Sequence, residues 1–83
     1  MQKSAAKAVR ERWRRAAASI ISQSRRDKDF TQSQLAAAVG WSRDTLAKVE
    51  TGKGKIEFGD IMLIAKALDE KPELLIRRIL GWN

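Results

Sequence analysis

Apolar residues recur every three or four positions along most of the chain, which is the spacing of one face of an α-helix. The spacing is found in residues 5–24, 32–39, 43–50, 58–68 and 72–80. No segment shows the sustained alternation of apolar and polar residues that is typical of a half-buried strand. The pattern therefore predicts an all-α protein with five helices.

The first of these segments is the longest and the most basic. Ser4 is a candidate N-cap for it, and Trp13 begins a stripe of residues that can be buried. The first two turns carry almost nothing apolar larger than alanine, so we expect them to project from the core. The sequence thus predicts a basic N-terminal extension at residues 1–12, one domain at residues 13–83, and a charged loop at residues 25–29.

Capping residues mark the boundaries of the other helices. Thr31 and Gln34 have the spacing of a capping box, in which each side chain bonds the backbone N–H of the other residue. Gly40 can end this second helix in the left-handed conformation, and Ser42 can cap the third helix two residues later. Pro72 suits the first turn of the fifth helix, since its missing N–H costs nothing there. The predicted buried face of the fourth helix consists of Phe58, Ile61, Met62, Ile64, Ala65 and Leu68.

The composition limits the chemistry that the protein can perform. The chain has 83 residues, no Cys and no His, so it lacks the thiols and imidazoles of zinc fingers and most nucleophilic triads. A chain of this length buries only about 60% of its unfolded surface, which leaves little room for a catalytic cleft. We therefore expect a binding protein that is not an enzyme and has no cofactor or metal. No apolar run approaches the roughly 18 residues of a membrane span, so we expect a cytoplasmic protein.

The charge is basic and unevenly placed. The net charge is +7, and residues 1–28 hold nine of the 17 Lys and Arg but only two of the ten Asp and Glu. A basic surplus favours a polyanionic partner such as nucleic acid. Two interpretations stay open for the most N-terminal bases, sequence-independent attraction to DNA and a merely solvated extension. These bases are Lys3, Lys7, Arg10, Arg12, Arg14 and Arg15.

Two short helices joined by a tight glycine turn form the pattern that points to a function. Leu35 and Val39 in one helix, and Leu46 and Val49 in the next, provide the apolar contacts that a helix-turn-helix needs. Four segments resemble the phage-repressor and Cro type of helix-turn-helix domain, also called the XRE family: Thr31–Ala36, Val39–Ser42, Val49–Lys53 and Ile64–Leu68. The resemblance covers about residues 25–75. It implies a compact five-helix lambda-repressor-like fold whose third helix lies in the DNA major groove.

The resemblance also implies which residues meet DNA. Arg43, Asp44 and Lys48 would read base edges, and they share the polar face of the third helix. Arginine can bond guanine O6 and N7, aspartate can accept from cytosine N4, and lysine can reach a guanine or a phosphate. The alternative for these residues is an ordinary solvated face.

The backbone of DNA would be met by another set of residues. Gln32 lies at the start of the second helix, where free amides already favour an anion, and it can also support the third helix. Ser42 and Thr45 are further candidates, with capping or packing as the alternative role. Two lysines, Lys53 and Lys55, lie in a loop after the third helix that we expect to be flexible.

Two further implications concern the scaffold and the assembly. The family pairs an arginine at the end of the first helix with a glutamate that ends the third, which implies a structural ion pair between Arg25 and Glu50. The fifth helix carries apolar residues around more than one face. Since repressors of this type bind two-fold symmetric operators as dimers, we expect a homodimer, the alternative being that the apolar surplus belongs to the core. The predicted interface is formed by Leu74, Ile76, Leu80 and Trp82.

These observations predict a sequence-specific transcriptional regulator, bacterial or phage-encoded. It would bind double-stranded DNA at a palindromic operator, as a homodimer, through the recognition helix at residues 43–50. A second class stays open, an antitoxin or other protein-interaction module of the same fold, whose partner would be a toxin or polymerase. A restriction-modification controller is a further alternative. Binding to a membrane surface is disfavoured, because the apolar residues of the first helix are needed in the core.

Overall fold

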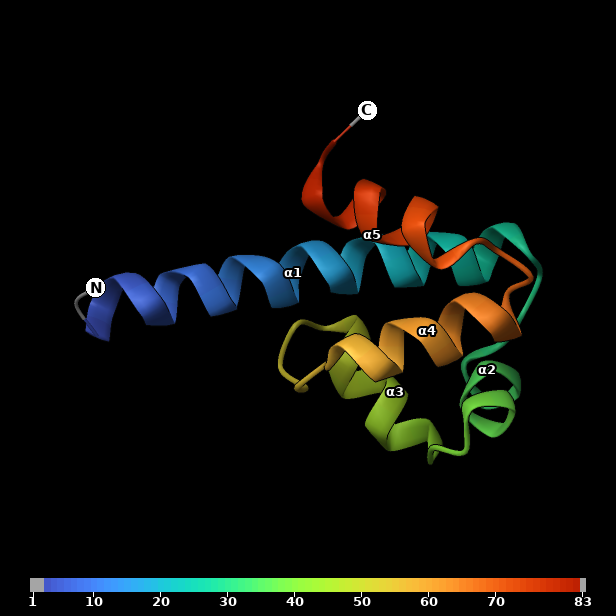
Figure 1. Cartoon of the computed structure of the whole chain (residues 1–83). Helices are drawn as coiled ribbons and strands as arrows, with labels where there is room; N and C mark the ends of the chain where they lie inside the picture. The colour runs from blue at the N-terminus through green and yellow to red at the C-terminus, as the bar shows by residue number, and fades with distance from the viewer. Residues whose placement is uncertain (1–2, 83) are drawn as a thin grey trace.

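The computed structural model describes residues 3–82, with side chains from residue 5 onward. This part of the chain forms five α-helices and no strand: α1 (Lys3–Asp27), α2 (Gln32–Val39), α3 (Arg43–Glu50), α4 (Phe58–Ala67) and α5 (Pro72–Leu80). Figure 1 shows α1 as a long rod, with α5 along one side of it and α2, α3 and α4 on the other. The predicted all-α class with five helices is confirmed. None of the described helices is both long enough and apolar enough to cross a bilayer.

The core lies where the five helices meet. α1 packs against α3 and α5, α2 contacts α3 and α4, and α4 also contacts α5. Half-buried Trp13, Phe30 and Trp41 pack against the rim of this core. The largest fully buried apolar side chains are Ile21, Leu35, Leu46, Ile61, Ile64, Leu68 and Leu75.

The N-terminal half of α1 extends beyond the core (Figure 1). The helix has 25 residues, which at 1.5 Å per residue makes it about 37 Å long, close to the 39 Å longest dimension of the molecule. No side chain between Ala5 and Ala16 is fully buried, and Ala17 is the first that is. Residues 1–2 of the predicted extension lie outside the described part of the chain.

The limits of α1 differ from the prediction. Ser4 lies inside the helix, which begins at Lys3, so Ser4 is not its N-cap. The charged segment predicted as a loop continues the helix as far as Asp27. Its side chains bond back one turn, since Arg26 Nη1 donates to Ser22 Oγ at 2.7 Å and Asp27 Oδ1 accepts from Gln23 Nε2 at 2.9 Å. The chain then reverses at Asp29, which has a positive φ of 60°.

The buried face of α4 is narrower than predicted. Phe58 and Met62, expected in the core, are 68% and 43% exposed, and Leu63 is 49% exposed. α4 is apolar on nearly every side, and only the side that includes Ile61 and Ile64 packs against its neighbours. The other side forms an apolar surface without a partner in this structure.

Candidate nucleic-acid interface

The start of α2 is fixed by the predicted capping box. Thr31 Oγ1 accepts from the Gln34 backbone N–H at 3.0 Å, and Gln34 Oε1 accepts from the Thr31 N–H at 2.9 Å. Each bond satisfies an amide that would otherwise lack a helical partner. These bonds hold the N-terminus of α2 in one conformation on the surface.

The turn between α2 and α3 depends on a glycine. Gly40 has φ 77°, in the left-handed region, and its N–H is directed at the last carbonyls of α2. The next amide, that of Trp41, donates to the Ala36 carbonyl at 2.8 Å, which closes the end of the helix. Ala36 is only 1% exposed, so a larger side chain would not fit where the helices meet.

α3 begins at an N-cap serine. Ser42 Oγ accepts from the Thr45 backbone N–H at 3.1 Å and is also bonded to Thr45 Oγ1 at 2.9 Å. The helix buries Leu46 and Val49. Its opposite side is exposed, and it brings together the three predicted base-reading residues, Arg43, Asp44 and Lys48.

A cluster of partly buried hydrogen bonds ties the end of α3 to α1 and α2. Arg25 Nε and Nη2 donate to the two oxygens of Glu50 at 2.8 and 3.1 Å, and the side chains are only 12% and 4% exposed. The remaining Arg25 nitrogen, Nη1, donates to the Phe30 carbonyl at 2.8 Å. The ion pair expected from the resemblance is thus present, and it is bidentate, the strong geometry for an arginine and a carboxylate.

Gln32 takes part in the same cluster. Its Nε2 donates to Glu50 Oε1 at 3.1 Å, and the side chain is partly buried. Of the two roles expected for this residue, contact with phosphate and support of the third helix, the structure contains the second. The sequence alone only weakly indicated this bond, because a glutamine amide can donate to an anion or accept from a cation.

The loop after α3 is more constrained than expected. The Lys48 carbonyl accepts from the amides of Lys53 and Gly54, both at 3.0 Å, and from Thr51 Oγ1 at 2.9 Å. A Cβ at Gly54 would lie 2.9 Å from the Val49 nitrogen, so this close approach needs glycine. The side chains of Lys53 and Lys55 are exposed, and the backbone at Lys53 and Gly54 is anchored to α3.

A helix-turn-helix family model matches residues 21–75, well over half of the chain. The chain belongs to this helix-turn-helix family. The match confirms the resemblance to the phage-repressor and Cro type, and it begins inside α1, so the basic first half of that helix lies outside the family pattern.

Solved structures of two other proteins have a similar fold. The clp gene regulator ClgR from Corynebacterium glutamicum has a TM-score of 0.78 and 23% sequence identity, over 83% of this chain and 90% of that chain. The restriction-modification controller protein C.AhdI from Aeromonas hydrophila has a TM-score of 0.70 and 27% identity, over 75% of this chain and 94% of that chain. These similarities confirm the compact helical fold. A search of curated proteins found no match.

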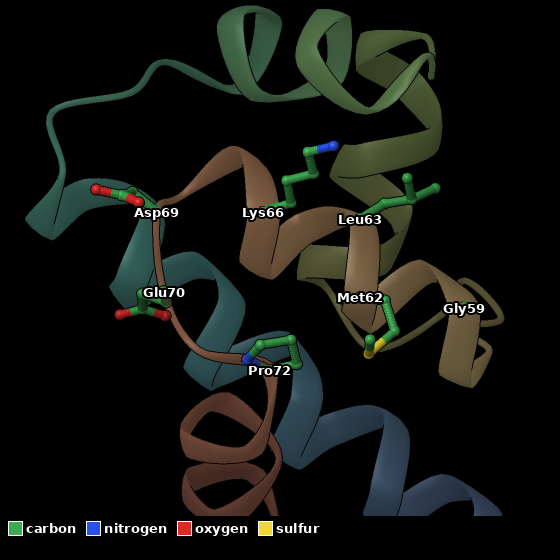
Figure 2. Close-up of a pocket in the computed structure, with 7 residues that line it drawn as sticks. All are labelled: Gly59, Met62, Leu63, Lys66, Asp69, Glu70 and Pro72. Carbon is green, nitrogen blue, oxygen red and sulfur yellow. The ribbon is translucent and has the colours of Figure 1, made fainter.

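The surface of this helix-turn-helix domain also has two apolar areas that no part of the described chain covers. The first is the exposed side of α4, where a hollow of about 530 Å³ is lined by Met62, Leu63 and the turn into α5 (Figure 2). The second is at the end of α5, where Leu80 is 43% and Trp82 66% exposed. Leu74 is 49% exposed on the same helix. Ile76, predicted at an interface, instead packs partly against the core.

Proposed function

We propose that the protein is a DNA-binding transcriptional regulator that inserts α3 into the major groove. The observation that carries the proposal is the exposed polar side of α3, in a chain that belongs to the helix-turn-helix family. Two similar structures are of proteins named as a gene regulator and a controller protein, which supports a regulatory role.

The base-reading residues are proposed from their chemistry and position. Arg43 is the first residue of α3, where recognition helices meet base edges, and its guanidinium suits guanine O6 and N7. Asp44 follows it in the first turn, where the helix dipole favours a carboxylate, and it can accept from cytosine N4. Lys48 lies one turn further along and reaches a guanine or a phosphate. Together they would read adjacent positions of one half-site.

Contacts with the phosphate backbone are proposed for five residues, and their hydrogen bonds decide what each can offer. Gln32 has one amide hydrogen bonded to Glu50, which leaves the second for a phosphate. The Ser42 and Thr45 hydroxyls bond each other, so only one of the two has its hydrogen available. Lys53 and Lys55 offer exposed ammonium groups.

We further propose that the regulator binds a palindromic operator as a homodimer. Symmetric helix-turn-helix dimers place two recognition helices about one DNA turn apart, roughly 34–36 Å. The exposed apolar residues of α5, Leu74 and Leu80, together with Trp82 just after the helix, are the proposed contacts between protomers. Ile76 would contribute less, because it already packs against the core.

Selection of binding sites from random duplex DNA tests the proposed function. We expect a two-fold symmetric consensus for the wild type. Arg43→Ala should relax the preference at one position in each half-site, since a bidentate contact contributes about 1–3 kcal/mol of discrimination. The control is Arg77→Ala, which removes an exposed arginine from α5 and should leave the consensus unchanged. Binding without any sequence preference would refute the proposal.

A second candidate function is a protein-interaction module, such as an antitoxin, and the two exposed apolar areas favour it. Contiguous apolar surface on a small protein often marks the binding site of a partner. An adjacent gene for a small toxin-like protein would name that partner, and coexpression followed by size-exclusion chromatography would test for a stable complex. A stable complex together with no DNA consensus would favour the module over the regulator.

A further inference from the structure

The basic residues in the first half of α1 are not distributed evenly around the helix. Lys7, Arg10 and Arg14 are spaced by three and four, so they lie along one side. Ala17 and Ile21 continue the same series and are fully buried. The side of α1 that packs on the core in its second half is therefore a basic stripe in its first half.

This stripe lies beside the loop that follows the recognition helix. Arg10 and Arg14 line a hollow of about 250 Å³ together with Lys55. On the other side of the loop, the position of a Gly52 Cβ is 3.5 Å from Arg15 Cγ, so helix and loop are in contact. Figure 1 shows the loop between α3 and α4 against the middle of α1, with the N-terminal half extending past it.

The charge of the combined surface is strongly positive. It contains five bases, Lys7, Arg10, Arg14, Lys53 and Lys55, and two acids, Glu11 and Glu57. Glu11 lies 3.9 Å from Lys7 in an exposed pair, and Glu57 shares the hollow with the two arginines. Neither Arg10 nor Arg14 forms an ion pair with another described residue. Exposed Arg10 and half-buried Arg14 therefore lie beside Lys55 without an ion-pair partner among the described residues.

We propose that the stripe of Lys7, Arg10 and Arg14 on α1 and the α3–α4 loop form one phosphate-binding surface that contacts the DNA flanking the half-site, whatever its base sequence. The inference rests on the proposed function, which identifies DNA as the polyanion. It adds a contact with DNA outside the helix-turn-helix. From Arg14 to Lys7 the helix extends about 10 Å. That distance matches about three base pairs at 3.4 Å each, so the surface lengthens the footprint on each side of the operator.

The test compares operator duplexes that end at the selected site with duplexes that carry five more base pairs of random sequence on each side. Fluorescence anisotropy is measured between 50 and 200 mM salt. The wild type should bind the longer duplex more tightly. R10Q/R14Q should lose that preference and keep the same consensus. Its salt slope should be shallower by about 1.8 per protomer, since each phosphate contact contributes about 0.9.

Two matched variants separate this surface from other effects. R12Q/R77Q also removes two positive charges, but on another part of the surface. Arg12 lines a hollow with Ile79 and Leu80 of α5, and Arg77 is exposed on α5. It should keep the preference for the longer duplex. R10K/R14K should keep it too, which excludes a loss of packing as the cause. Equal losses in R10Q/R14Q and R12Q/R77Q, or a wild type indifferent to the flanks, would overturn the inference.

Failure of the proposed function gives a different result. In that case no consensus emerges from the selection, and the salt slope is measured on a random-sequence duplex of 30 base pairs. A shallower slope for R10Q/R14Q but not for R12Q/R77Q still supports the phosphate-binding surface. Equal slopes for both variants and the wild type reject it.

Discussion

At the scale of single residues, Glu50 connects the scaffold to the proposed reading face. It ends α3, and its carboxylate accepts three N–H bonds, two from Arg25 and one from Gln32. These donors come from α1 and α2, so one side chain fixes the position of α3 relative to both. They also offset a negative charge that would otherwise lie near the proposed phosphate contacts.

Glu50→Ala should destabilise the fold strongly. It leaves the Arg25 guanidinium, which is only 12% exposed, without a counter-charge, and such a loss costs about 3–5 kcal/mol. The free energy of unfolding of a small domain is about 5–15 kcal/mol in total, so the substitution should remove a large part of it. Urea denaturation followed by circular dichroism measures the change. Glu11→Ala is the control, since the ion pair of Glu11 with Lys7 is exposed and worth at most about 1 kcal/mol. A loss below 1 kcal/mol in Glu50→Ala would contradict the prediction.

At the scale of helices, the sequence was informative wherever a boundary depended on local chemistry. The capping box of Thr31 and Gln34, the left-handed Gly40 and the N-cap Ser42 were all predicted and are present. Each of these signals involves residues within a few positions of one another, so a single segment contains all the information.

The parts that the sequence did not predict depend on contacts between distant segments or on ambiguous residues. α1 continues to Asp27, and the following reversal uses Asp29 rather than a glycine, so no breaker marks it. The exposure of Phe58 and Met62 was missed because α4 is apolar on almost every side. Periodicity alone does not select the side that packs. Support of α3 by Gln32 was expected from the resemblance, but its partner was not, because the bond to Glu50 joins residues 18 positions apart, beyond the reach of any local motif.

The loop between α3 and α4 provides a prediction at this scale. Gly54→Ala places a Cβ 2.9 Å from the Val49 nitrogen and 3.1 Å from its Cγ2. The backbone of α3 cannot easily move, so overpacking should cost about 1–3 kcal/mol and shift Lys53 and Lys55. The melting temperature measured by thermal denaturation and the affinity for the selected operator should both fall.

A second glycine serves as the matched control for Gly54. Gly59 lies in α4 with nothing near the position of an added Cβ. Alanine is favoured over glycine in a helix by about 0.5–1 kcal/mol, so Gly59→Ala should raise the melting temperature. If Gly54→Ala were as stable as Gly59→Ala, the close approach of loop and helix would not be a constraint in solution.

At the scale of the whole molecule, charged and apolar surfaces are kept apart. The net charge of +7 comes from residues 1–28, and α1 carries its bases past the core beside the loop after α3. The exposed apolar residues lie mainly on α4 and at the end of α5. One part of the surface therefore suits a polyanion, while the apolar areas suit a protein, including a second copy of the chain.

The proposed assembly gives the last prediction, that L80S/W82S separates the homodimer. Both residues are exposed, Leu80 to 43% and Trp82 to 66%, so the loss of their side chains should weaken association without unfolding the protomer. F58S/M62S is the matched variant, because it removes two exposed apolar side chains from α4 and should leave the dimer intact. Sedimentation velocity at micromolar concentration measures the mass of each species. L80S/W82S should sediment as a monomer and lose affinity for the two-fold operator while still contacting one half-site.

If only F58S/M62S became monomeric, the interface would lie on α4 over the hollow of Figure 2. A wild type that is monomeric even on the operator would reject the homodimer altogether.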